Sequence, residues 1–373
     1  MRKDTVAVLD VGSSKLHHIV GERGLNKTFI IKSSAEAAYS GFSESAFLEP
    51  DEVPKRIRAL VAKTEAELRT GIDRIFVGVP GEFMISYCKF FRISLTKKKK
   101  INDDDVAKLY DAAFNLNSKE LKLIARSAVN FVLSGNRKVS SPKGAVSDTL
   151  GGMLTFYLGK SDYIQLLDGA LKSAGIGNVE YFPVTLAEIL YLFESYERDN
   201  GGILVDIGYL TSTFSYFSGD GILYSNYFSD GGGYVTAHLY EKFRLSSFSA
   251  AEKLKRMINI SYNPYDDARY EFDDGGKTVS VPVSSANAAV KECLDGMSEK
   301  IAAFIKEGVL NHHGNTVISL TGGGISYVRG AKEYLAGRLN AVVKTVAPKI
   351  PMFNKPVNSS AFSLFDVALK KNA

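Results

Sequence analysis

Near its N-terminus the chain reads Val6-Ala7-Val8-Leu9-Asp10-Val11-Gly12-Ser13-Ser14-Lys15. The apolar run predicts a buried strand, and the glycine with the polar residues after it predicts a tight turn. Glycine lets the backbone approach a ligand closely, and consecutive N–H groups with two hydroxyls form an anion-binding concavity. Lys15 adds a charge for phosphate oxygens, and Asp10 is placed to hold Mg²⁺ through water. Taken alone, an ordinary hairpin turn explains the same residues.

The same pattern returns about 200 residues later, after the apolar run Ile203-Leu204-Val205. The second copy reads Asp206-Ile207-Gly208-Tyr209-Leu210-Thr211-Ser212. An internal repeat of this kind indicates two similarly folded halves. Turns from two such halves can face each other across a cleft, where ligands bind. Asp206, Gly208 and Thr211 therefore join the candidate site, with Asp206 as a second water-mediated Mg²⁺ ligand.

A third segment, Leu320-Thr321-Gly322-Gly323-Gly324, follows a strand pattern and precedes a helix pattern. Three glycines at this place suit the close packing of a flat adenosine against the backbone. A glycine triplet alone is a weak signal. Here it completes a set of three elements in a defined order along the chain.

This ordered set resembles the actin-like ATPase superfamily and, within it, most closely the FtsA family of bacterial cell-division proteins. Further resemblances are Val77-Gly78-Val79-Pro80-Gly81-Glu82, the acidic helix start Ile101-Asn102-Asp103-Asp104-Asp105-Val106, and the loop pieces Phe131-Val132-Leu133-Ser134-Gly135 and Ser141-Pro142-Lys143-Gly144. The resemblance implies an α/β, actin-like ATPase fold. Such a fold has two duplicated ribonuclease-H-like lobes around a nucleotide cleft, here with a small α+β insert.

The resemblance also implies four parts of the chain. The expected parts are a first large lobe at 1–83 and 160–199 with the first phosphate loop, an inserted small α+β subdomain at 84–159, a second large lobe at 200–239 and 309–373 with the second phosphate loop and the adenosine loop, and a small subdomain of the second lobe at 240–308.

ATP and Mg²⁺ are the cofactors that the resemblance implies. Gly231-Gly232-Gly233 matches a glycine turn that opens a helix beside the nucleotide, which adds Gly232 and Gly233 to the site. Ala251-Glu252-Lys253-Leu254-Lys255 matches an element whose acidic and basic residues bracket the ribose and adenine, roles that fall here on Glu252 and Lys255. The alternative for this pair is an ordinary ion pair on a solvated helix face.

The second loop departs from the family's pattern, Asp-Ile-Gly-Gly-Gly-Thr-x-Asp. Tyr209 and Leu210 stand where the family has glycines, and Thr213 stands where it has the second aspartate. Bulky side chains restrict the approach of a phosphate, so we expect slow or absent hydrolysis with nucleotide binding retained. Glu188 falls where actin places a water-orienting glutamine, which makes it the candidate catalytic residue. The alternative for Glu188 is an exposed helix position.

The function that the resemblance implies is an ATP-binding scaffold of cell division. It would self-associate as a filament or homo-oligomer and bind the C-terminal tail of FtsZ, on the small subdomain at 240–308. A PilM-like adaptor of type IV pilus assembly, whose second loop is similarly degenerate, stays open as an alternative. An actin-superfamily sugar kinase is a further alternative, but no convincing catalytic aspartate occurs in the first half, and the insert argues against that class.

Composition and charge limit the partners. The 373 residues carry 46 Lys and Arg against 41 Asp and Glu, and this net +5 is too weak to indicate nucleic acid. No signal-peptide pattern and no apolar run of about 18 residues occur, so we expect a cytoplasmic protein, placed by the resemblance at the cytoplasmic face of the inner membrane at the division site. The lysine run Lys97–Lys100 reads as a solvated loop or hairpin tip, or as a contact for an acidic partner or anionic lipid.

The end of the chain bears on the membrane. The segment Phe362–Leu369 looks like the last helix of the FtsA core, and only Lys370-Lys371-Asn372-Ala373 follow it. In the family, a linker and a basic amphipathic helix that lies in the bilayer interface usually come next. We therefore expect membrane contact to be indirect, or to depend on a missing C-terminal helix.

Overall fold

Two five-stranded sheets form the centre of the protein, for which a computed structural model describes residues 5–25, 28–262, 267–308 and 316–372. The first sheet has the order β11-β6-β1-β2-β3 and the second the order β14-β13-β12-β17-β18. The strands of the first are β1 (Thr5–Val11), β2 (Lys15–Arg23), β3 (Phe29–Ala38), β6 (Arg74–Val79) and β11 (Asn178–Pro183). Those of the second are β12 (Gly202–Ile207), β13 (Ser212–Ser218), β14 (Gly221–Phe228), β17 (Ile318–Thr321) and β18 (Val343–Thr345).

The two sheets repeat one connectivity, as the internal repeat predicted. In each, three strands that follow one another in the chain pair antiparallel, and two further strands add in parallel beside the first of the three. Asp10 lies opposite His17 in the first sheet, and Asp206 lies opposite Thr213 in the second. The two aspartates therefore occupy equivalent positions near the ends of equivalent strands.

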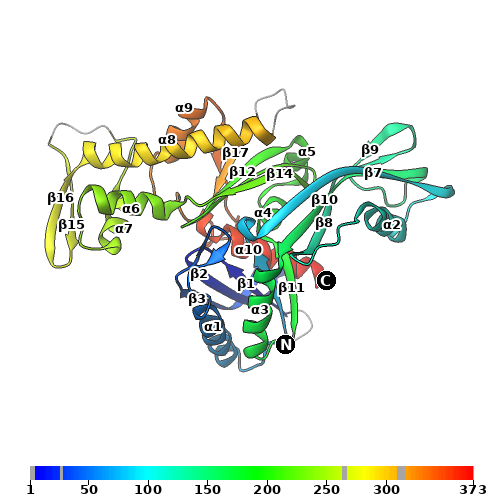
Figure 1. Ribbon diagram of the computed structural model, residues 1–373, viewed down its shortest axis with the longest axis horizontal. Helices are drawn as coiled ribbons and strands as arrows, with labels where there is room; N and C mark the ends of the chain where they lie inside the picture. The colour runs from blue at the N-terminus through cyan, green and yellow to red at the C-terminus, as the bar shows by residue number, and fades with distance from the viewer. Residues whose placement is uncertain (1–4, 26–27, 263–266, 309–315, 373) are drawn as a thin grey trace.

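Helices α1 (Glu52–Leu68), α3 (Ser161–Ser173), α4 (Val184–Leu192) and α10 (Ser359–Lys371) pack around the first sheet (Figure 1). The short strands β4 (Phe42–Ser43) and β5 (Ala46–Phe47) complete this lobe, and α5 (Ser195–Asn200) connects it to β12 of the second lobe. The position of α10 differs from the expected grouping of residues 309–373 with the second lobe. Its residues are buried on nearly all sides of the helix, and the apolar ones belong to the core of the first sheet, in contact with β1 and α4.

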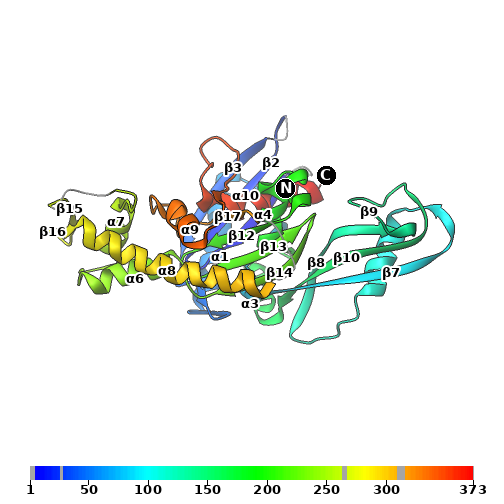
Figure 2. The ribbon, with the colours of Figure 1, turned by 90° about the horizontal axis from the view of Figure 1, so that it is seen from above.

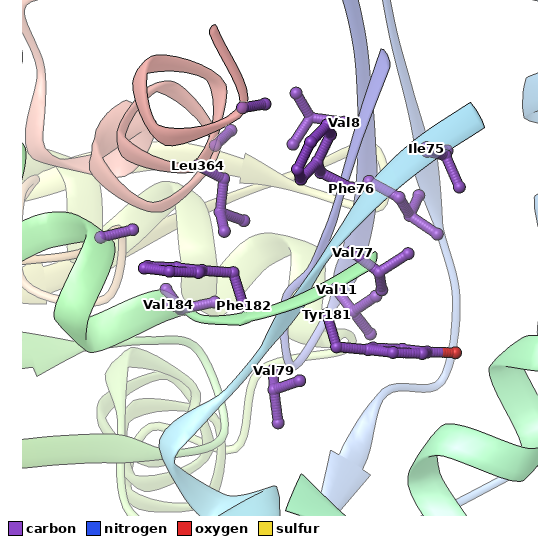
Figure 3. Close-up of a cluster of buried hydrophobic side chains, with 14 of the residues drawn as sticks. Val8, Val11, Ile75, Phe76, Val77, Val79, Tyr181, Phe182, Val184 and Leu364 are labelled. Atoms are coloured by element: carbon purple, nitrogen blue, oxygen red, sulfur yellow. The ribbon is translucent and has the colours of Figure 1, made fainter. Parts of the chain in front are cut away.

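Leu364 illustrates how α10 is held. Its side chain lies among Val8, Phe182 and their neighbours (Figure 3), and it packs directly over Gly78, where no side chain stands in the way. The close approach of the helix to the strand thus depends on a glycine.

Replacing Leu364 with alanine is expected to lower the free energy of unfolding of this lobe by about 2–5 kcal/mol, because the change leaves a cavity in a packed core. Urea unfolding followed by circular dichroism measures the loss. Met352→Ala serves as the control, since Met352 is 90% exposed and its loss is expected to stay within about 0.5 kcal/mol. Equal effects of the two changes would contradict the assignment of α10 to this core.

The second lobe carries α6 (Gly232–Lys242), α7 (Phe248–Met257), α8 (Val283–Gly308), α9 (Ala331–Leu339) and the hairpin of β15 (Arg269–Asp274) with β16 (Lys277–Pro282). The two strands pair antiparallel, with Asp274 opposite Lys277 and Gly275-Gly276 between them. This hairpin lies with α7 at one extremity of the molecule (Figure 1). None of the helices in the described part of the chain is both long and apolar enough to cross a bilayer.

The insert protrudes at the opposite extremity (Figures 1 and 2). It consists of β7 (Met84–Lys100), α2 (Asp103–Ala113), β8 (Leu121–Leu133), β9 (Arg137–Val139) and β10 (Val146–Lys160), with the sheet order β7-β10-β8-β9. The acidic helix start is confirmed, because Asn102 and Asp105 form a capping box at the start of α2. The interpretation of Lys97–Lys100 as a loop or hairpin tip is wrong: these lysines end β7, where Lys99 and Lys100 pair with Ser147 and Val146.

The base of the insert is joined to the second sheet. The Thr155 hydroxyl donates a hydrogen bond to the carbonyl of Ile222 at 2.9 Å, and the N–H of Ile222 donates to the Tyr157 hydroxyl at 3.1 Å. Because all three residues are buried, these bonds tie β10 to β14 in a place that water does not reach. The insert is therefore anchored to both lobes at its base and free at its far end.

Candidate functional site

Two turns of the same form face each other between the lobes. In the first, the N–H of Gly12 donates to the carbonyl of Lys15 at 3.0 Å; in the second, the N–H of Gly208 donates to the carbonyl of Thr211 at 2.9 Å. Residues 12–14 connect β1 to β2, and residues 208–211 connect β12 to β13. The structure thus places the two sequence copies as equivalent hairpin turns.

The two turns also touch. The N–H of Leu210 donates a hydrogen bond to the Ser13 hydroxyl oxygen at 3.0 Å, across the gap between the lobes. Four further N–H groups of the turns, those of Ser13, Ser14, Tyr209 and Thr211, have no acceptor among the residues that the structure describes. Donors from both sides of one gap form an arrangement suited to an anion with several oxygens.

A cleft of about 490 Å³ opens between these turns. The predicted site residues that line it are Asp10, Gly12, Ser13, Ser14, Lys15, Asp206, Gly208, Thr211, Glu252, Lys255, Gly322 and Gly323. Residues from both lobes and from all three glycine-containing segments therefore meet in one cavity. Four predicted residues do not line this cleft: Gly232, Gly233, Gly324 and Glu188.

The three glycines outside the cleft support the second turn from behind. The N–H of Gly232 donates to the carbonyl of Gly208 at 2.9 Å, and that of Gly233 donates to the carbonyl of Tyr209 at 2.7 Å. A β-carbon on Gly232 would collide with the backbone of Gly324. Glycine is needed here so that three backbone segments can pack together. These residues position the turn, and their own N–H groups at the start of α6 are already used.

Three carboxyl groups lie close together beneath the turns. Burial raises the pKa of Asp10 to about 6, and burial with the nearby Asp10 charge raises the pKa of Asp206 to about 7. The Ser360 hydroxyl donates to the Asp10 carboxylate at 2.6 Å and partly opposes its shift. Burial, Asp206 and Asp10 together raise the pKa of Glu188 well above its ordinary value. The three groups therefore carry fewer than three negative charges near neutral pH.

Glu188 is fully buried in α4, so the alternative that it is an exposed helix residue is wrong. Neither of its carboxyl oxygens has a hydrogen-bond partner among the described residues. A buried polar group without a partner is costly, and α4 holds this one directly behind Asp10 and Asp206. Its role as a water-orienting residue stays a prediction. Glu188 is not among the residues that line the cleft, which argues against direct contact with a bound phosphate.

Lys255 is buried rather than solvated, which excludes the alternative of an ordinary surface ion pair for this residue. Its ammonium donates to the carbonyl of Gly232 at 3.0 Å and to the Thr236 hydroxyl at 2.9 Å, and it pairs with the Glu252 carboxylate at 2.7 Å. The ring of Tyr209 lies 5.7 Å from the same ammonium. The bulky Tyr209 thus packs against a side chain of the cleft wall. Lys255 links α6, α7 and the second turn.

Among the cleft residues that the sequence reasoning missed are Glu36, Tyr327 and Ser360. Glu36 forms an ion pair with Lys15, the cation expected to meet phosphate. Tyr327 lies beneath the guanidinium of Arg256, which is 4.7 Å from its ring centre. An aromatic residue three positions after Gly324 was a usable signal for a flat ligand. Nothing in the local sequence around Ser360 pointed to the cleft.

The residues fit a hydrated cation better than a directly bound one. No group of three or more His, Cys, Asp and Glu side chains in the described ranges is arranged to hold a metal ion. Asp10 and Asp206 nevertheless both line the cleft, and their raised pKa values reflect a site with little compensating positive charge. Mg²⁺ that keeps most of its water shell would supply that positive charge beside the two carboxylates.

The raised pKa of Asp206 has a consequence for stability. The folded protein holds this proton more tightly than the unfolded chain, so the contribution of Asp206 to stability is lost as the pH rises from about 4 to about 7. Asp206→Asn removes this titration. The stability of the variant relative to the wild type is therefore expected to rise across this range, by about 2 kcal/mol or more. Thermal unfolding at several pH values measures the difference, and a difference that does not change with pH would contradict the raised pKa of Asp206.

The comparisons with known proteins agree with this fold. No protein-family model matches the chain. The cell division protein FtsA of Enterococcus faecalis is 23% identical over 372 residues, which cover 98% of this chain and 83% of FtsA. In the solved PilM–PilN type IV pilus biogenesis complex, one chain superimposes with a TM-score of 0.65 at 16% identity, covering 98% of each chain. MreB 5 of Spiroplasma citri bound to AMPPNP superimposes with a TM-score of 0.58 at 12% identity, covering 100% of this chain and 98% of that one.

The fold is therefore that of the actin-like ATPases, as the sequence predicted. Within that class the chain is FtsA-like. All five curated relatives found are named cell division protein FtsA, at 21–23% identity over nearly the full length of this chain. The likeness to PilM is one of fold alone and gives the pilus alternative less support.

Proposed function

We propose that this protein is an ATP-binding, actin-like scaffold of bacterial cell division. The observation that carries the proposal is the cleft in which unpaired N–H groups of two equivalent turns face each other. Backbone donors on two lobes favour a ligand whose oxygens bridge the lobes, as a chain of phosphates does. The FtsA-like sequence supports the cell-division role, and the solved MreB 5 neighbour was determined with AMPPNP.

Within this proposal, each part of the cleft takes one part of the nucleotide. The phosphates lie between the turns at 12–15 and 208–211, close to Lys15. Asp10 and Asp206 hold hydrated Mg²⁺, which would supply positive charge beside the phosphates. The adenosine lies toward Gly322 and Gly323, where a residue without a side chain allows close approach and Tyr327 offers an aromatic face.

We infer slow or absent hydrolysis. Tyr209 and Leu210 add side chains beside the phosphates, and Thr213 lacks the carboxylate of the family's pattern. Glu188 is fully buried and is not among the residues that line the cleft. ATP then acts as a ligand that holds the two lobes together through hinge closure, and the closed form presents surfaces to partners.

The proposed partners are further copies of this chain and the C-terminal tail of FtsZ, bound on the small subdomain at 240–308. The proposed place of action is the cytoplasmic face of the inner membrane at the division site. The PilM-like adaptor is the second candidate, favoured by the superposition on the PilM–PilN complex alone. Binding of the FtsZ tail peptide supports the division role, and binding only of a pilus-protein peptide would replace it.

Titration of the purified protein with Mg·ATP tests the nucleotide part. We expect a dissociation constant in the micromolar range or below, and at least tenfold weaker binding by Asp10→Ala. Asp162→Ala is the matched control, because Asp162 is an exposed acidic residue at the start of α3. Sedimentation with and without ATP tests self-association. No binding at millimolar ATP would contradict the proposal, and phosphorylation of a sugar would assign the kinase class instead.

A further inference from the structure

Positive charge is concentrated in the insert. Residues 84–159 contain 13 Lys and Arg against 6 Asp and Glu, a net charge of +7, whereas the whole chain is +5. The remaining residues together are therefore slightly negative. A charge asymmetry of this size between parts of one protein indicates an electrostatic contact surface.

The cations gather at the far end of the insert. Lys97, Lys98 and Lys100 lie among the last four residues of β7, and Arg137 and Lys138 begin β9. These two strands form the opposite edges of the four-stranded sheet of the insert. The Arg92 guanidinium of β7 donates to the Asn136 side-chain carbonyl at 2.8 Å, just before β9. We call these five exposed residues the basic tip. They lie at the end of the insert that points away from both lobes (Figure 2).

The charge of the basic tip is not neutralised within the protein. No carboxylate of the described residues lies within 4 Å of any of its five cations. Two acidic residues near β7 in the chain pair with other lysines: Asp105 with Lys99 at 2.6 Å, and Asp103 with Lys143 at 2.6 Å. The five cations are thus available to an external partner.

We propose that the basic tip binds the surface of an anionic lipid membrane. Its cations are exposed side chains spread over two strands of a protruding end, and they do not line the cleft between the lobes. A flat, diffuse negative surface matches this arrangement, whereas a small ligand is recognised in a concave pocket. Each Lys or Arg near a surface of anionic lipid headgroups raises the membrane partition coefficient roughly fivefold.

This contact is independent of the nucleotide cleft. The basic tip lies at the opposite end of the insert from the buried anchor of Thr155 and Tyr157 on β14. It therefore projects from a rigid base, and membrane contact leaves both lobes unobstructed. A failure of this proposal leaves the nucleotide proposal untouched, and the reverse also holds.

Sedimentation of the full chain with lipid vesicles tests the proposal. We expect binding to vesicles of phosphatidylcholine mixed with phosphatidylglycerol, and none to vesicles of phosphatidylcholine alone. Binding is expected to weaken steeply with added NaCl, because salt screens exposed charges. The triple variant Lys97→Glu, Lys98→Glu, Lys100→Glu is expected to bind the mixed vesicles on the order of 100-fold more weakly than the wild type, or not at all.

Two further variants make the test specific. Arg137→Glu with Lys138→Glu removes the charge of the other strand, and is expected to weaken binding even where the triple variant folds poorly. Lys55→Glu, Arg58→Glu, Lys63→Glu is the matched control: it changes the net charge equally, on exposed positions of α1 in the first lobe. It should retain at least half of the binding. Equal losses in the control and tip variants would overturn the proposal, and so would failure of the wild type to bind the mixed vesicles, even where it binds an acidic protein or nucleic acid instead.

Discussion

Gly322→Ala is expected to lower the free energy of unfolding of the second lobe by about 2–6 kcal/mol and to weaken nucleotide binding at least tenfold. Gly322 has φ of +90°, a conformation that residues with a side chain adopt only under strain. A β-carbon there would also lie far inside contact distance of the Asp206 carboxylate and of the Ile207 carbonyl. The strain and the collision together push the adenosine segment away from the second turn. Thermal unfolding and titration with Mg·ATP measure the two effects.

Gly337→Ala is the matched control for this prediction. Gly337 lies in α9 of the same lobe, and a β-carbon there meets no atom within 4 Å. Because alanine favours helix over glycine, the control is expected to raise stability by up to about 1 kcal/mol and to leave nucleotide binding unchanged. If Gly322→Ala also proved neutral, the close packing of the adenosine segment against the second turn would be contradicted.

Lys255→Met is expected to cost about 2–4 kcal/mol of stability and to weaken nucleotide binding more than tenfold. The substitution keeps an apolar stem but removes the ammonium, so the Glu252 carboxylate loses its buried ion-pair partner and the Gly232 carbonyl loses one donor. Arg256 and the Thr236 hydroxyl still contact Glu252. Removing one partner of a buried ion pair is strongly destabilising. The expected loss is below that of a fully buried pair, because the Glu252 side chain is 25% exposed. Thermal unfolding and ATP titration measure the effects.

Arg256→Met is the matched control for stability. Arg256 pairs with the other oxygen of the same carboxylate at 3.2 Å, but its side chain is 56% exposed. An exposed pair of this kind contributes about 0–1 kcal/mol. Equal losses for the two variants would show that Lys255 is not the buried link between α6 and α7.

The phosphate turns could be predicted because their signal is local. Each turn combines an apolar strand, an aspartate and a glycine within a few residues, and the copy at Asp206 made the pattern specific. The strand pairing that follows, Asp10 with His17 and Asp206 with Thr213, puts both aspartates at the cleft. Local composition determines such hairpins directly. Their mutual position depended on the repeat, since only a duplicated fold brings two distant turns together.

Burial within helices was predicted less well, although the signal was present. The α4 segment, Val184–Leu192, is apolar almost throughout, and a helix that is apolar on all sides is buried. Glu188 therefore lies in the interior rather than on an exposed face. The same pattern in α10 buries its residues against the first sheet. Which sheet α10 would cover could not be predicted, because that choice depends on contacts between segments far apart in the chain.

The roles of Gly232, Gly233 and Gly324 could not be predicted from the sequence and became clear only from the structure. Gly232, Gly233 and Gly324 read as ligand contacts in the sequence, yet two of them donate their N–H groups to carbonyls of the second turn. A glycine needed for backbone packing and one needed for ligand approach look alike in a sequence. Likewise, the hydrogen bond between Leu210 and Ser13 joins residues of different lobes, and no local pattern predicts such a contact.

Hydrogen exchange of the backbone amides, measured by mass spectrometry with and without Mg·ATP, tests the central claim most directly. The account predicts that ATP slows exchange in the peptides that contain Ser13 and Ser14 and in those that contain Tyr209 and Thr211, because the phosphates accept hydrogen bonds from these amides. Exchange in β9, at the far end of the insert, should not change. Slower exchange at only one of the two turns, or at neither while ATP is bound, would contradict a nucleotide held between the two lobes.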